Sequence, residues 1–359
     1  MGKLNSKYEA LFYRKLSGKR VQCGLCPRRC WIEDGKVGYC GVRKNMDGIL
    51  YAISYGKAAR MSEEVIETEA VFHFEPGAKI LSLGNIGCNL SCVYCQNWTF
   101  SQIQHADEDI IFDYTPEQVV QTALERDIKI LSWTYNDPVI WIEFVIDTAR
   151  IARKYGLLNL FKSAMFINPE PLEALMDVMD IFTASIKSVN PGYHRQFTKG
   201  WPQPILDAVK QIYKAKRHHL EVSNLVVTGA SDKDKDFEEF IQWFKANLDV
   251  NVPAHFVCFH PSYQYTKVEK TPLSVVERAR QIALKAGLEY PYIGNVFMHE
   301  GVNTYCKSCS SLLVERVGLN ANKVGLEPDS KMYICKECNA QTPIRIAYKR
   351  SEAYEKIEV

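Results

Sequence analysis

Between residues 79 and 287 the chain alternates short apolar runs with longer segments of helical periodicity. Six runs rich in Val, Ile, Leu and Phe predict buried strands. They are KILSLGN from residue 79, IKILSW, LLNLFKS, IFTASIK, HLEVSNLVV and VPAHFVCFH. The predicted helices between and after them start at Thr115, cover 138–155, start at Asn168, and cover 203–217, 235–247 and 272–286. Apolar strands alternating with helices indicate an α/β fold whose parallel sheet is buried on both faces.

Several predicted helices carry their own boundary signals. Thr115, Asn168 and Thr271 each precede a proline, which predicts a capping side chain followed by proline at the first helical position. Gly156 and Gly287 are expected to end two of the helices. Six strand–helix units predict a partial (β/α)6 TIM barrel, open on one side, with its chemistry at the carboxyl ends of the strands.

The segments on either side of this pattern differ from it. Residues 1–75 predict a short helix and, around GILYAISYGKA, an alternating strand, and we interpret them as an N-terminal Cys-rich, metal-binding cap. Residues 76–299 form the predicted barrel. Residues 300–359 are interpreted as a C-terminal module with four cysteines that resembles a zinc ribbon.

Composition narrows the class of protein. The chain has 359 residues, 47% of them hydrophobic, which is enough for a substantial core. Its 44 Lys and Arg against 42 Asp and Glu give no electrostatic basis for a nucleic-acid partner. No apolar run approaches the roughly 18 residues of a membrane span, and the first residues are too charged for a signal peptide. We therefore expect a cytoplasmic protein with no membrane partner.

Eleven of the twelve cysteines fall into three groups, and their spacing indicates metal sites rather than disulfides. The first group is Cys23, Cys26, Cys30 and Cys40; the second is Cys88, Cys92 and Cys95; the third is Cys306, Cys309, Cys335 and Cys338. Cys258 stands alone.

The second group has the spacing C-x3-C-x2-C, which ligates three irons of a [4Fe-4S] cluster and leaves the fourth iron open to a substrate. The alternative is a zinc knuckle that takes its fourth ligand from elsewhere. The context favours the cluster, because the buried strand KILSLG, bounded by Pro76-Gly77 and Gly84, places the cysteines in a loop after a strand.

The other two groups are closed sets of four. The third group consists of two CxxC pairs, the pattern of a structural zinc ribbon, with an auxiliary iron–sulfur cluster as the competing interpretation. The first group is less regular, and zinc and a second [4Fe-4S] cluster remain equally good interpretations because thiolates suit both.

Polar residues at strand ends are candidates for cofactor binding. Asn136 and Asp137 are suited to receive an ammonium group, or they form a turn in which Asp137 caps the next helix. Ser185 and Lys187 after the fourth strand are candidates for hydroxyl and carboxylate groups, or are simply solvated. Asn224 is either a cofactor contact or an ordinary buried polar group.

The strand AHFVCFHP contains two further candidates. Alternation puts residues 256, 258 and 260 on one face and 255, 257 and 259 on the other. Cys258 and His260 are therefore expected to share an inward surface, where Cys258 is a candidate hydrogen-atom donor. The competing interpretation is a core cysteine and a hydrogen-bonded histidine.

These motifs resemble the radical S-adenosylmethionine (SAM) superfamily and, within it, the AmmeMemoRadiSam radical SAM enzymes (AmrS-like, related to glycyl-radical-enzyme activases). The resemblance rests, in order, on CGLCPRRC, GCNLSCVYCQNW, TYNDP, IKSVNPGYHRQFTKG, HFVCFHPSY, YIGN and the final cysteine pairs. It implies a [4Fe-4S] cluster on Cys88, Cys92 and Cys95 with SAM bound beside it. It also implies that the Asn136–Asp137 region has the position of the family's motif for the SAM amino group, and Tyr94 is the aromatic that such cysteine loops usually carry. The candidate cofactor-binding residues are therefore Tyr94, Asn136, Asp137, Lys162, Ser163, Ser185, Lys187, Asn224 and His260.

The chain departs from that family where substrate is selected. It reads TYNDP where TYNEP is usual, and Phe161-Lys162-Ser163-Ala164-Met165 where a TNG-like turn is usual. It also has Thr228-Gly229-Ala230-Ser231-Asp232 in place of a PGYND-like loop. These departures fall at strand ends, so they concern the substrate more than radical formation, and the chain is interpreted as a specialised offshoot of the family.

We therefore expect reductive cleavage of SAM to a 5'-deoxyadenosyl radical, which abstracts hydrogen from an unactivated carbon. The expected partners are a protein or peptide substrate and a low-potential electron donor. The rival reaction is cobalamin-assisted radical C-methylation of a protein residue, although the DxHxxG cobalamin motif is absent. The rival from another class is a metal-stabilised scaffold in which all three cysteine groups are structural.

Overall fold

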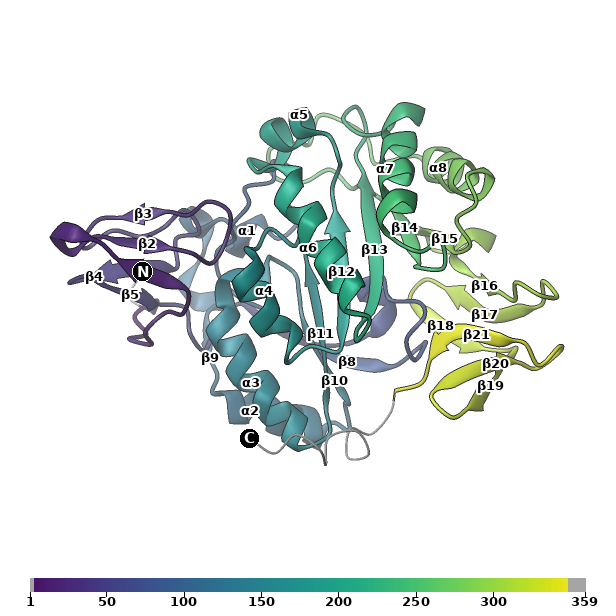
Figure 1. The fold of residues 1–359 in the computed structure, drawn as a ribbon, viewed down its shortest axis with the longest axis horizontal. Helices are drawn as coiled ribbons and strands as arrows, with labels where there is room; N and C mark the ends of the chain where they lie inside the picture. The colour runs from purple at the N-terminus through teal and green to yellow at the C-terminus, as the bar shows by residue number, and fades with distance from the viewer. Residues whose placement is uncertain (1–2, 348–359) are drawn as a thin grey trace.

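The computed structural model describes residues 3–347. Its centre is an eight-stranded sheet in the order β15-β14-β13-β12-β11-β10-β8-β7 (Figure 1). The strands are β7 (Arg60–Val65), β8 (Lys79–Gly84), β10 (Ile130–Trp133), β11 (Leu158–Ser163), β12 (Ile181–Ile186), β13 (His219–Val226), β14 (Ala254–Cys258) and β15 (Pro291–Gly294). All neighbours pair in parallel except β7, which is antiparallel to β8.

Six helices cover the outer face of this sheet. They are α2 (Pro116–Glu125), α3 (Ile142–Lys154), α4 (Pro169–Met176), α6 (Pro202–Ala215), α7 (Asp234–Asn247) and α8 (Leu273–Lys285). Their apolar faces pack on outward strand residues such as Trp133, Phe161, Phe182 and Phe256, which form the main core. The six predicted strand–helix units and the partial barrel are therefore confirmed, and β7 and β15 form the two edges of the sheet in the described residues.

The helix boundaries follow the sequence at some ends and not at others. Thr115 caps α2 with a complete capping box shared with Gln118. Gly156 and Gly287 follow α3 and α8 with φ of 75° and 93°, a conformation in which glycine has no side-chain strain. The caps expected at two other helices are wrong, because Asn168 and Thr271 use their side chains elsewhere.

Tertiary partners explain both failures. The Asn168 amide donates to the carbonyls of Gly24 and Cys26 in the N-terminal segment. The Thr271 hydroxyl donates to the carbonyl of Val226 and accepts from the amide of Phe259, and α8 begins two residues later.

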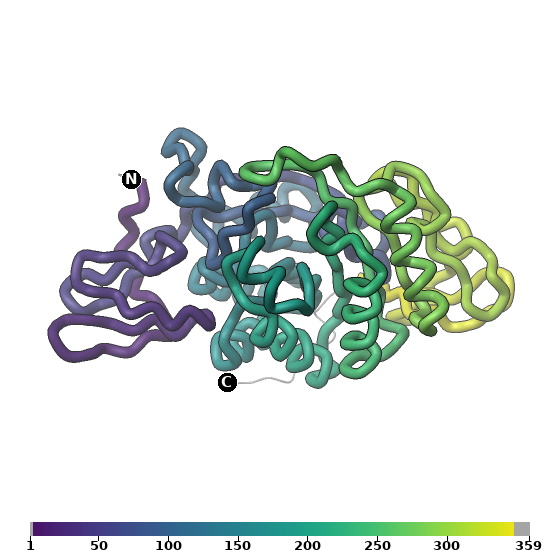
Figure 2. Tube along the Cα trace, turned by 90° about the horizontal axis from the view of Figure 1, so that it is seen from above, coloured from purple at the N-terminus to yellow at the C-terminus, as the bar shows by residue number. Residues whose placement is uncertain are grey.

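The N-terminal segment lies beside the barrel at the end shown in purple in Figures 1 and 2. Its strands are β1 (Tyr13–Lys15), β2 (Val21–Cys23), β3 (Trp31–Ile32), β4 (Arg43–Met46), β5 (Ile49–Ala52) and β6 (Lys57–Ala58). The expected strand around GILYAISYGKA is confirmed as β5. The short helix expected in this segment is wrong, because residues 3–75 contain only strands, turns and the 3-10 turns Ser17–Lys19 and Ile66–Glu69.

The C-terminal module lies at the opposite end of the barrel. It consists of β16 (Thr304–Tyr305), β17 (Leu312–Val317), β18 (Asn320–Lys323), β19 (Leu326–Asp329), β20 (Met332–Cys335) and β21 (Gln341–Arg345). Arg316 attaches the module to the barrel, because its buried guanidinium donates to Glu67, to the carbonyl of Phe72 and to Thr304.

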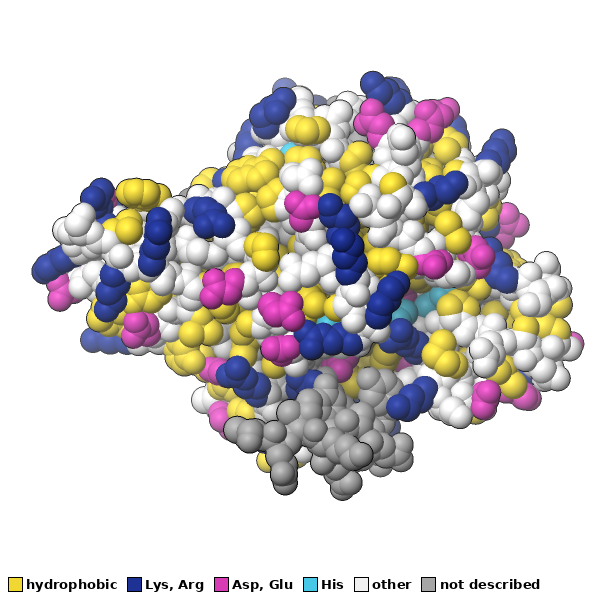
Figure 3. Space-filling model, viewed as in Figure 1, with side chains coloured by type: hydrophobic (Ala, Val, Ile, Leu, Met, Phe, Trp, Pro, Cys, Tyr) yellow, Lys and Arg dark blue, Asp and Glu magenta, His cyan; other side chains and the backbone are white. Residues whose placement is uncertain are grey.

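The remaining elements are short and lie mostly around the carboxyl ends of the barrel strands. They are α1 (Trp98–Ser101), β9 (Phe112–Asp113), α5 (Pro191–Tyr193), a π-helical turn at His194–Thr198, and 3-10 turns at Ile103–His105, Glu108–Ile110, Pro138–Trp141 and Glu300–Val302. No helix of the described chain is long and apolar enough to cross a membrane. On the face shown in Figure 3, acidic and basic side chains are interspersed, without a large patch of one sign.

Candidate active site in the partial barrel

The three cysteines of the C-x3-C-x2-C motif lie in the loop between β8 and α1. This loop is held by main-chain hydrogen bonds from Ser91 to Thr198 and from Val93 to Phe197. All three thiols, of Cys88, Cys92 and Cys95, line one cavity of about 750 Å³ inside the barrel. The loop therefore presents three sulfur ligands to a space large enough for a bound molecule.

Burial disfavours the ionised form of the Cys88 and Cys92 thiols, so they need a strong positive charge beside them before they can act as thiolate ligands. Burial raises the pKa of Cys92 to about 12 and the pKa of Cys88 well above its usual value. The Lys187 ammonium opposes this rise at Cys92, while burial lowers the pKa of Lys187 itself. Ionised thiols at this position need a strong positive charge, and iron supplies one.

The turn after β10 supports the cysteine loop. Tyr135 has a φ of 72°, which is strained for a residue with a side chain. The Asn136 amide nitrogen donates to the carbonyls of Asn85 and Gly87, and its oxygen accepts from the amide of Asn85. Asn136 lines the cavity, but its polar atoms already hold the start of the cysteine loop.

Asp137 lies beside the same cavity and is also fully engaged. Its carboxylate accepts hydrogen bonds from the Ser163 hydroxyl at 2.8 Å and from the amides of Val139 and Ala164. Burial raises the pKa of Asp137, and the bond from Ser163 partly opposes that rise. The capping role for Asp137 is thus confirmed, and its assignment to SAM stays a prediction.

Most of the other predicted cofactor residues line this cavity as well. Tyr94 is buried and accepts a hydrogen bond from the Tyr193 hydroxyl at 2.7 Å. Lys187 donates to the Ser185 hydroxyl at 2.7 Å at the end of β12. The residues shared by the prediction and the cavity wall are Tyr94, Asn136, Asp137, Lys162, Ser163, Ser185, Lys187 and His260.

The inward orientation expected for Cys258 is wrong. His255, Val257 and Phe259 line the cavity, whereas Cys258 is buried in the core on the helix side of the sheet. His260 reaches the cavity because β14 ends at Cys258 and the strand alternation stops there. Cys258 therefore has no access to the cavity, and its role as hydrogen-atom donor has no geometric support.

Asn224 is also turned away from the cavity. Its amide donates to the carbonyl of Ile186, and its neighbours Ser223 and Leu225 line the cavity wall instead. The interpretation of Asn224 as an ordinary buried polar group describes its contacts, and the expectation that it touches SAM has no support from its position.

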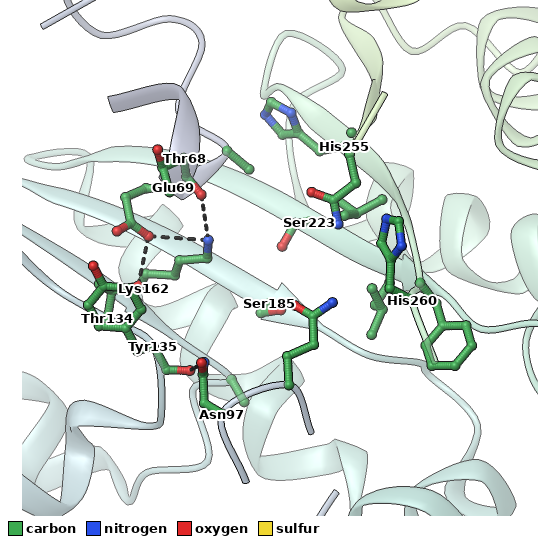
Figure 4. Close-up of a pocket in the computed structure, with 18 of the residues that line it drawn as sticks. Thr68, Glu69, Asn97, Thr134, Tyr135, Lys162, Ser185, Ser223, His255 and His260 are labelled. Carbon is green, nitrogen blue, oxygen red and sulfur yellow. Dashed lines mark hydrogen bonds and ion pairs between the residues drawn. The ribbon is translucent and has the colours of Figure 1, made fainter. Parts of the chain in front are cut away.

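The cavity wall also holds a carboxylate that sequence reasoning missed. Glu69 is 1% exposed and accepts hydrogen bonds from the hydroxyls of Ser132 and Thr134. Lys162 lies opposite, with its Nζ 3.2 Å from Glu69 and 3.0 Å from the carbonyl of Thr68 (Figure 4). No sequence signal marks Glu69, because its partners come from β10 and β11 and meet it only in the fold.

A second buried carboxylate, Glu221, lies deeper on the inner face of the barrel. It accepts hydrogen bonds from His219 at 2.8 Å and His255 at 2.7 Å, and from the amides of Phe72 and His73. Burial alone would raise the pKa of Glu221, but these donors lower it well below its usual value. His255 therefore lines the cavity with its ring oriented by the Glu221 carboxylate, a role that the sequence did not indicate.

The third cysteine group forms a compact site outside the barrel. The four Sγ atoms of Cys306, Cys309, Cys335 and Cys338 lie within 4.8 Å of one another. Two of the Sγ–Sγ distances, Cys306 to Cys338 and Cys309 to Cys335, are 3.7 Å. The predicted four-cysteine site is confirmed as a geometric set.

A parallel sheet rolled into a partial barrel, with three cysteines presented by the loop after its first parallel strand, defines a radical SAM protein. The family model for the Radical SAM superfamily matches residues 84–244. The uncharacterized protein MJ0808 of Methanocaldococcus jannaschii is 40% identical over 337 residues, which are 94% of this chain and 99% of that protein. The chain belongs to the radical SAM superfamily, whose members are enzymes that use a [4Fe-4S] cluster and SAM.

More distant relatives cover less of the chain. The pyruvate formate-lyase-activating enzyme of Listeria monocytogenes is 23% identical over 185 residues, which are 47% of this chain and 72% of that enzyme. Among solved structures, a radical SAM methyltransferase from Sphaerobacter thermophilus matches with a TM-score of 0.48 and 12% identity, over 61% of this chain and 67% of that one.

Proposed function

We propose that this enzyme cleaves SAM reductively and uses the resulting radical to remove hydrogen from an unactivated carbon of a protein or peptide residue. The observation that carries this proposal is that Cys88, Cys92 and Cys95 line one cavity that extends well beyond them. Three thiolates leave one iron of a cube without a protein ligand, and the cavity has room for SAM beside it. The superfamily relationship speaks against the purely structural scaffold.

When bound, the reduced cluster would donate one electron to SAM, whose carbon–sulfur bond would break to give methionine and the 5'-deoxyadenosyl radical. The protein's own residues orient and shield the reactants. Lys187 and Ser185 offer donors to an anionic or hydroxyl group, and the buried walls at Tyr94 and Phe259 exclude water that would divert a reactive species. Asn136 keeps the cysteine loop in position through its three main-chain hydrogen bonds.

A polypeptide substrate is supported by the rim of the cavity. Phe297 and Leu319 both line the opening and are 73% and 52% exposed, and Met298 next to Phe297 is 68% exposed. Exposed apolar side chains at the mouth of a cavity are suited to hold a chain segment while one residue enters. The name of the Listeria relative, an activating enzyme for pyruvate formate-lyase, states that it too acts on another enzyme.

We further propose that the C-terminal site holds zinc. A tetrahedron of four sulfurs at the usual zinc–sulfur distance of about 2.3 Å has edges of about 3.8 Å. The two 3.7 Å Sγ–Sγ distances in this site agree with that edge. Zinc here would stabilise the module that contributes Gly318 and Leu319 to the cavity rim.

The proposed activity is tested by anaerobic reconstitution with iron and sulfide, followed by incubation with SAM and dithionite. We expect 5'-deoxyadenosine to form in the reconstituted protein and not in protein without iron. Mass comparison of candidate proteins, incubated with and without the enzyme, then identifies the modified residue. Transfer of a methyl group, accompanied by a corrin spectrum in the purified protein, would replace hydrogen abstraction alone by cobalamin-assisted methylation.

A further inference from the structure

The four N-terminal cysteines lie in neighbouring segments of the cap, within residues 23–40. Cys23 ends β2, Cys26 and Cys30 lie in the loop to β3, and Cys40 precedes β4. The amide of Cys23 donates to the carbonyl of Cys30 at 3.0 Å, and the Cys30 Sγ accepts a hydrogen bond from the amide of Tyr39, the residue before Cys40, at 3.5 Å. These contacts bring Cys23, Cys30 and Cys40 together, with Cys26 in the loop between the first two, and a metal centre is the ordinary reason for four buried or half-buried thiols in one place.

The spacing of these thiols differs from that of the C-terminal site. In the described chain, the C-terminal cysteines are the only group of three or more ligands whose atoms all lie within 4.8 Å of one another. No three thiols of the N-terminal set meet that limit, and neither do Cys88, Cys92 and Cys95. A single zinc ion holds its sulfurs about 3.8 Å apart, given zinc–sulfur bonds of about 2.3 Å, whereas a cube of four irons holds them much farther apart.

The N-terminal set is also joined directly to the loop that carries the catalytic cysteines. Arg28, between Cys26 and Cys30, donates to the carbonyl of Asn89 at 2.6 Å. Tyr39, next to Cys40, donates from its hydroxyl to Ser91 at 2.8 Å. Asn89 and Ser91 lie between Cys88 and Cys92, so both cysteine sets are parts of one hydrogen-bonded unit.

The main chain at Cys40 packs directly against the main chain at Gly87, the residue before Cys88. A Cβ atom placed on Gly87 would come within 2.5 Å of the Cys40 carbonyl oxygen, and Gly87 has a φ of +83°. Only glycine therefore fits at this position, which lets the chain beside Cys40 touch the residue before Cys88. The contact brings the two metal-binding segments together without an intervening side chain.

We propose that Cys23, Cys26, Cys30 and Cys40 bind a second iron–sulfur cluster that passes electrons to the cluster on Cys88, Cys92 and Cys95. A cube ligated by four thiolates has no open iron, so it carries electrons without binding substrate. A low-potential one-electron donor is oxidised as this centre is reduced, and the centre is reoxidised as the catalytic cluster gains the same electron. The inference rests on the cluster position in the proposed function but not on its substrate.

Metal content of the full-length chain, reconstituted anaerobically, tests the first half of this inference. We expect about eight irons and eight sulfides per chain, and about four of each in the triple variant Cys88→Ala, Cys92→Ala, Cys95→Ala. This halving does not depend on whether a variant of the N-terminal set folds. A triple variant without iron, in a chain that binds zinc at the N-terminal set, would overturn the inference.

Electron paramagnetic resonance of the dithionite-reduced protein tests the second half. The triple variant reports the N-terminal centre alone, and Cys30→Ala, at the least buried of the four positions, removes that centre and reports the catalytic cluster alone. We expect the spectrum of the wild-type protein to be broader than the sum of the two, because adjacent reduced clusters interact magnetically. A wild-type spectrum equal to that sum would contradict electron transfer between the two centres.

The control is Cys258→Ala, which removes a buried cysteine outside all three sets and should keep the full iron content. Retention of the C-terminal metal in every variant checks that the protein is folded. Iron in the triple variant is measured without SAM, so a failure of the N-terminal centre is distinguishable from a failure of the proposed reaction, which appears as missing 5'-deoxyadenosine in the wild-type protein.

Discussion

The side-chain amide of Asn136 is hydrogen bonded in both directions to the main chain of Asn85, three residues before the first cysteine of the catalytic loop. Because the same amide also donates to the carbonyl of Gly87, one side chain holds the entry to the loop from the neighbouring strand end. The loop's position is thus decided by the turn after β10 as well as by its own sequence.

Removing this amide should loosen the loop. We expect Asn136→Ala to lower the free energy of unfolding by about 1–3 kcal/mol, because buried main-chain groups lose their partners. We also expect lower iron content after anaerobic reconstitution. The measurements are urea unfolding and iron analysis, with Asn247→Ala at the end of α7 as the control. Equal iron content in the two variants would contradict this role.

Replacing Cys92 and replacing Cys258 should have opposite effects on activity. We expect Cys92→Ala to abolish 5'-deoxyadenosine formation while the fold and the C-terminal metal remain, because Cys92 lines the cavity. Cys258→Ala should keep full turnover and lose about 1 kcal/mol of stability, because Cys258 packs only in the core. Appreciable product from Cys92→Ala, or loss of turnover in Cys258→Ala, would contradict these assignments.

Removing one member of the Lys162–Glu69 ion pair should destabilise the protein more than removing both. We expect Lys162→Met to cost about 3 kcal/mol, because it leaves the buried Glu69 carboxylate without its cation. The double variant Lys162→Met, Glu69→Gln should recover part of that loss, since no charge is then buried. Thermal unfolding of the two single variants and the double variant measures this coupling, and strictly additive losses would argue against it.

His73 should make the fold sensitive to mild acid. Burial lowers the pKa of His73 from 6.5 to about 3, so between pH 6.5 and 4.5 the unfolded chain takes up a proton that the folded chain does not. The contribution of His73 to the free energy of unfolding is fully present above pH 6.5, the pKa of the histidine in the unfolded chain. Below that pH the contribution falls by about 1.4 kcal/mol per pH unit. We expect His73→Gln to reduce the slope of unfolding free energy against pH by about one proton.

The control for that experiment is Gln121→Ala, which changes an exposed side chain that has no titratable group. Its slope should equal that of the wild-type protein. An unchanged slope in His73→Gln would mean that the buried histidine takes up its proton without unfolding.

Substitutions at the cavity rim should weaken the binding of a protein substrate and leave the binding of the cofactors unchanged. We expect the double variant Phe297→Ser, Leu319→Ser to raise KM for a protein substrate about tenfold or more, since each exposed apolar contact contributes about 1 kcal/mol or more to binding. Formation of 5'-deoxyadenosine without substrate should stay at the wild-type rate. Trp31→Ser, at a 62% exposed position on β3 and outside the cavity, is the matched control.

Much of the fold is predictable from local pattern. The apolar runs and helix signals predict six strand–helix units because hydrophobic periodicity and capping are properties of neighbouring residues. The spacing within each cysteine motif is equally local, although only the fold brings the two C-terminal CxxC pairs together, with Cys306 3.7 Å from Cys338 and Cys309 3.7 Å from Cys335. The strand β15 and the antiparallel edge β7 were not predicted, since short edge strands are stabilised by their neighbours and not by their own sequence.

The sequence by itself determined the order of the strands and helices along the chain, the three cysteine groups and the position of the Cys88–Cys95 loop after a buried strand. Only the tertiary structure decided which face of β14 lines the cavity, because both faces of a buried parallel strand are apolar and alternation cannot distinguish them. It also decided that Glu69 meets Lys162 and that Glu221 meets His255, and it placed Cys40 against Gly87. Such pairings join residues far apart in the chain, so they exist only once packing of the whole core has fixed where each segment lies.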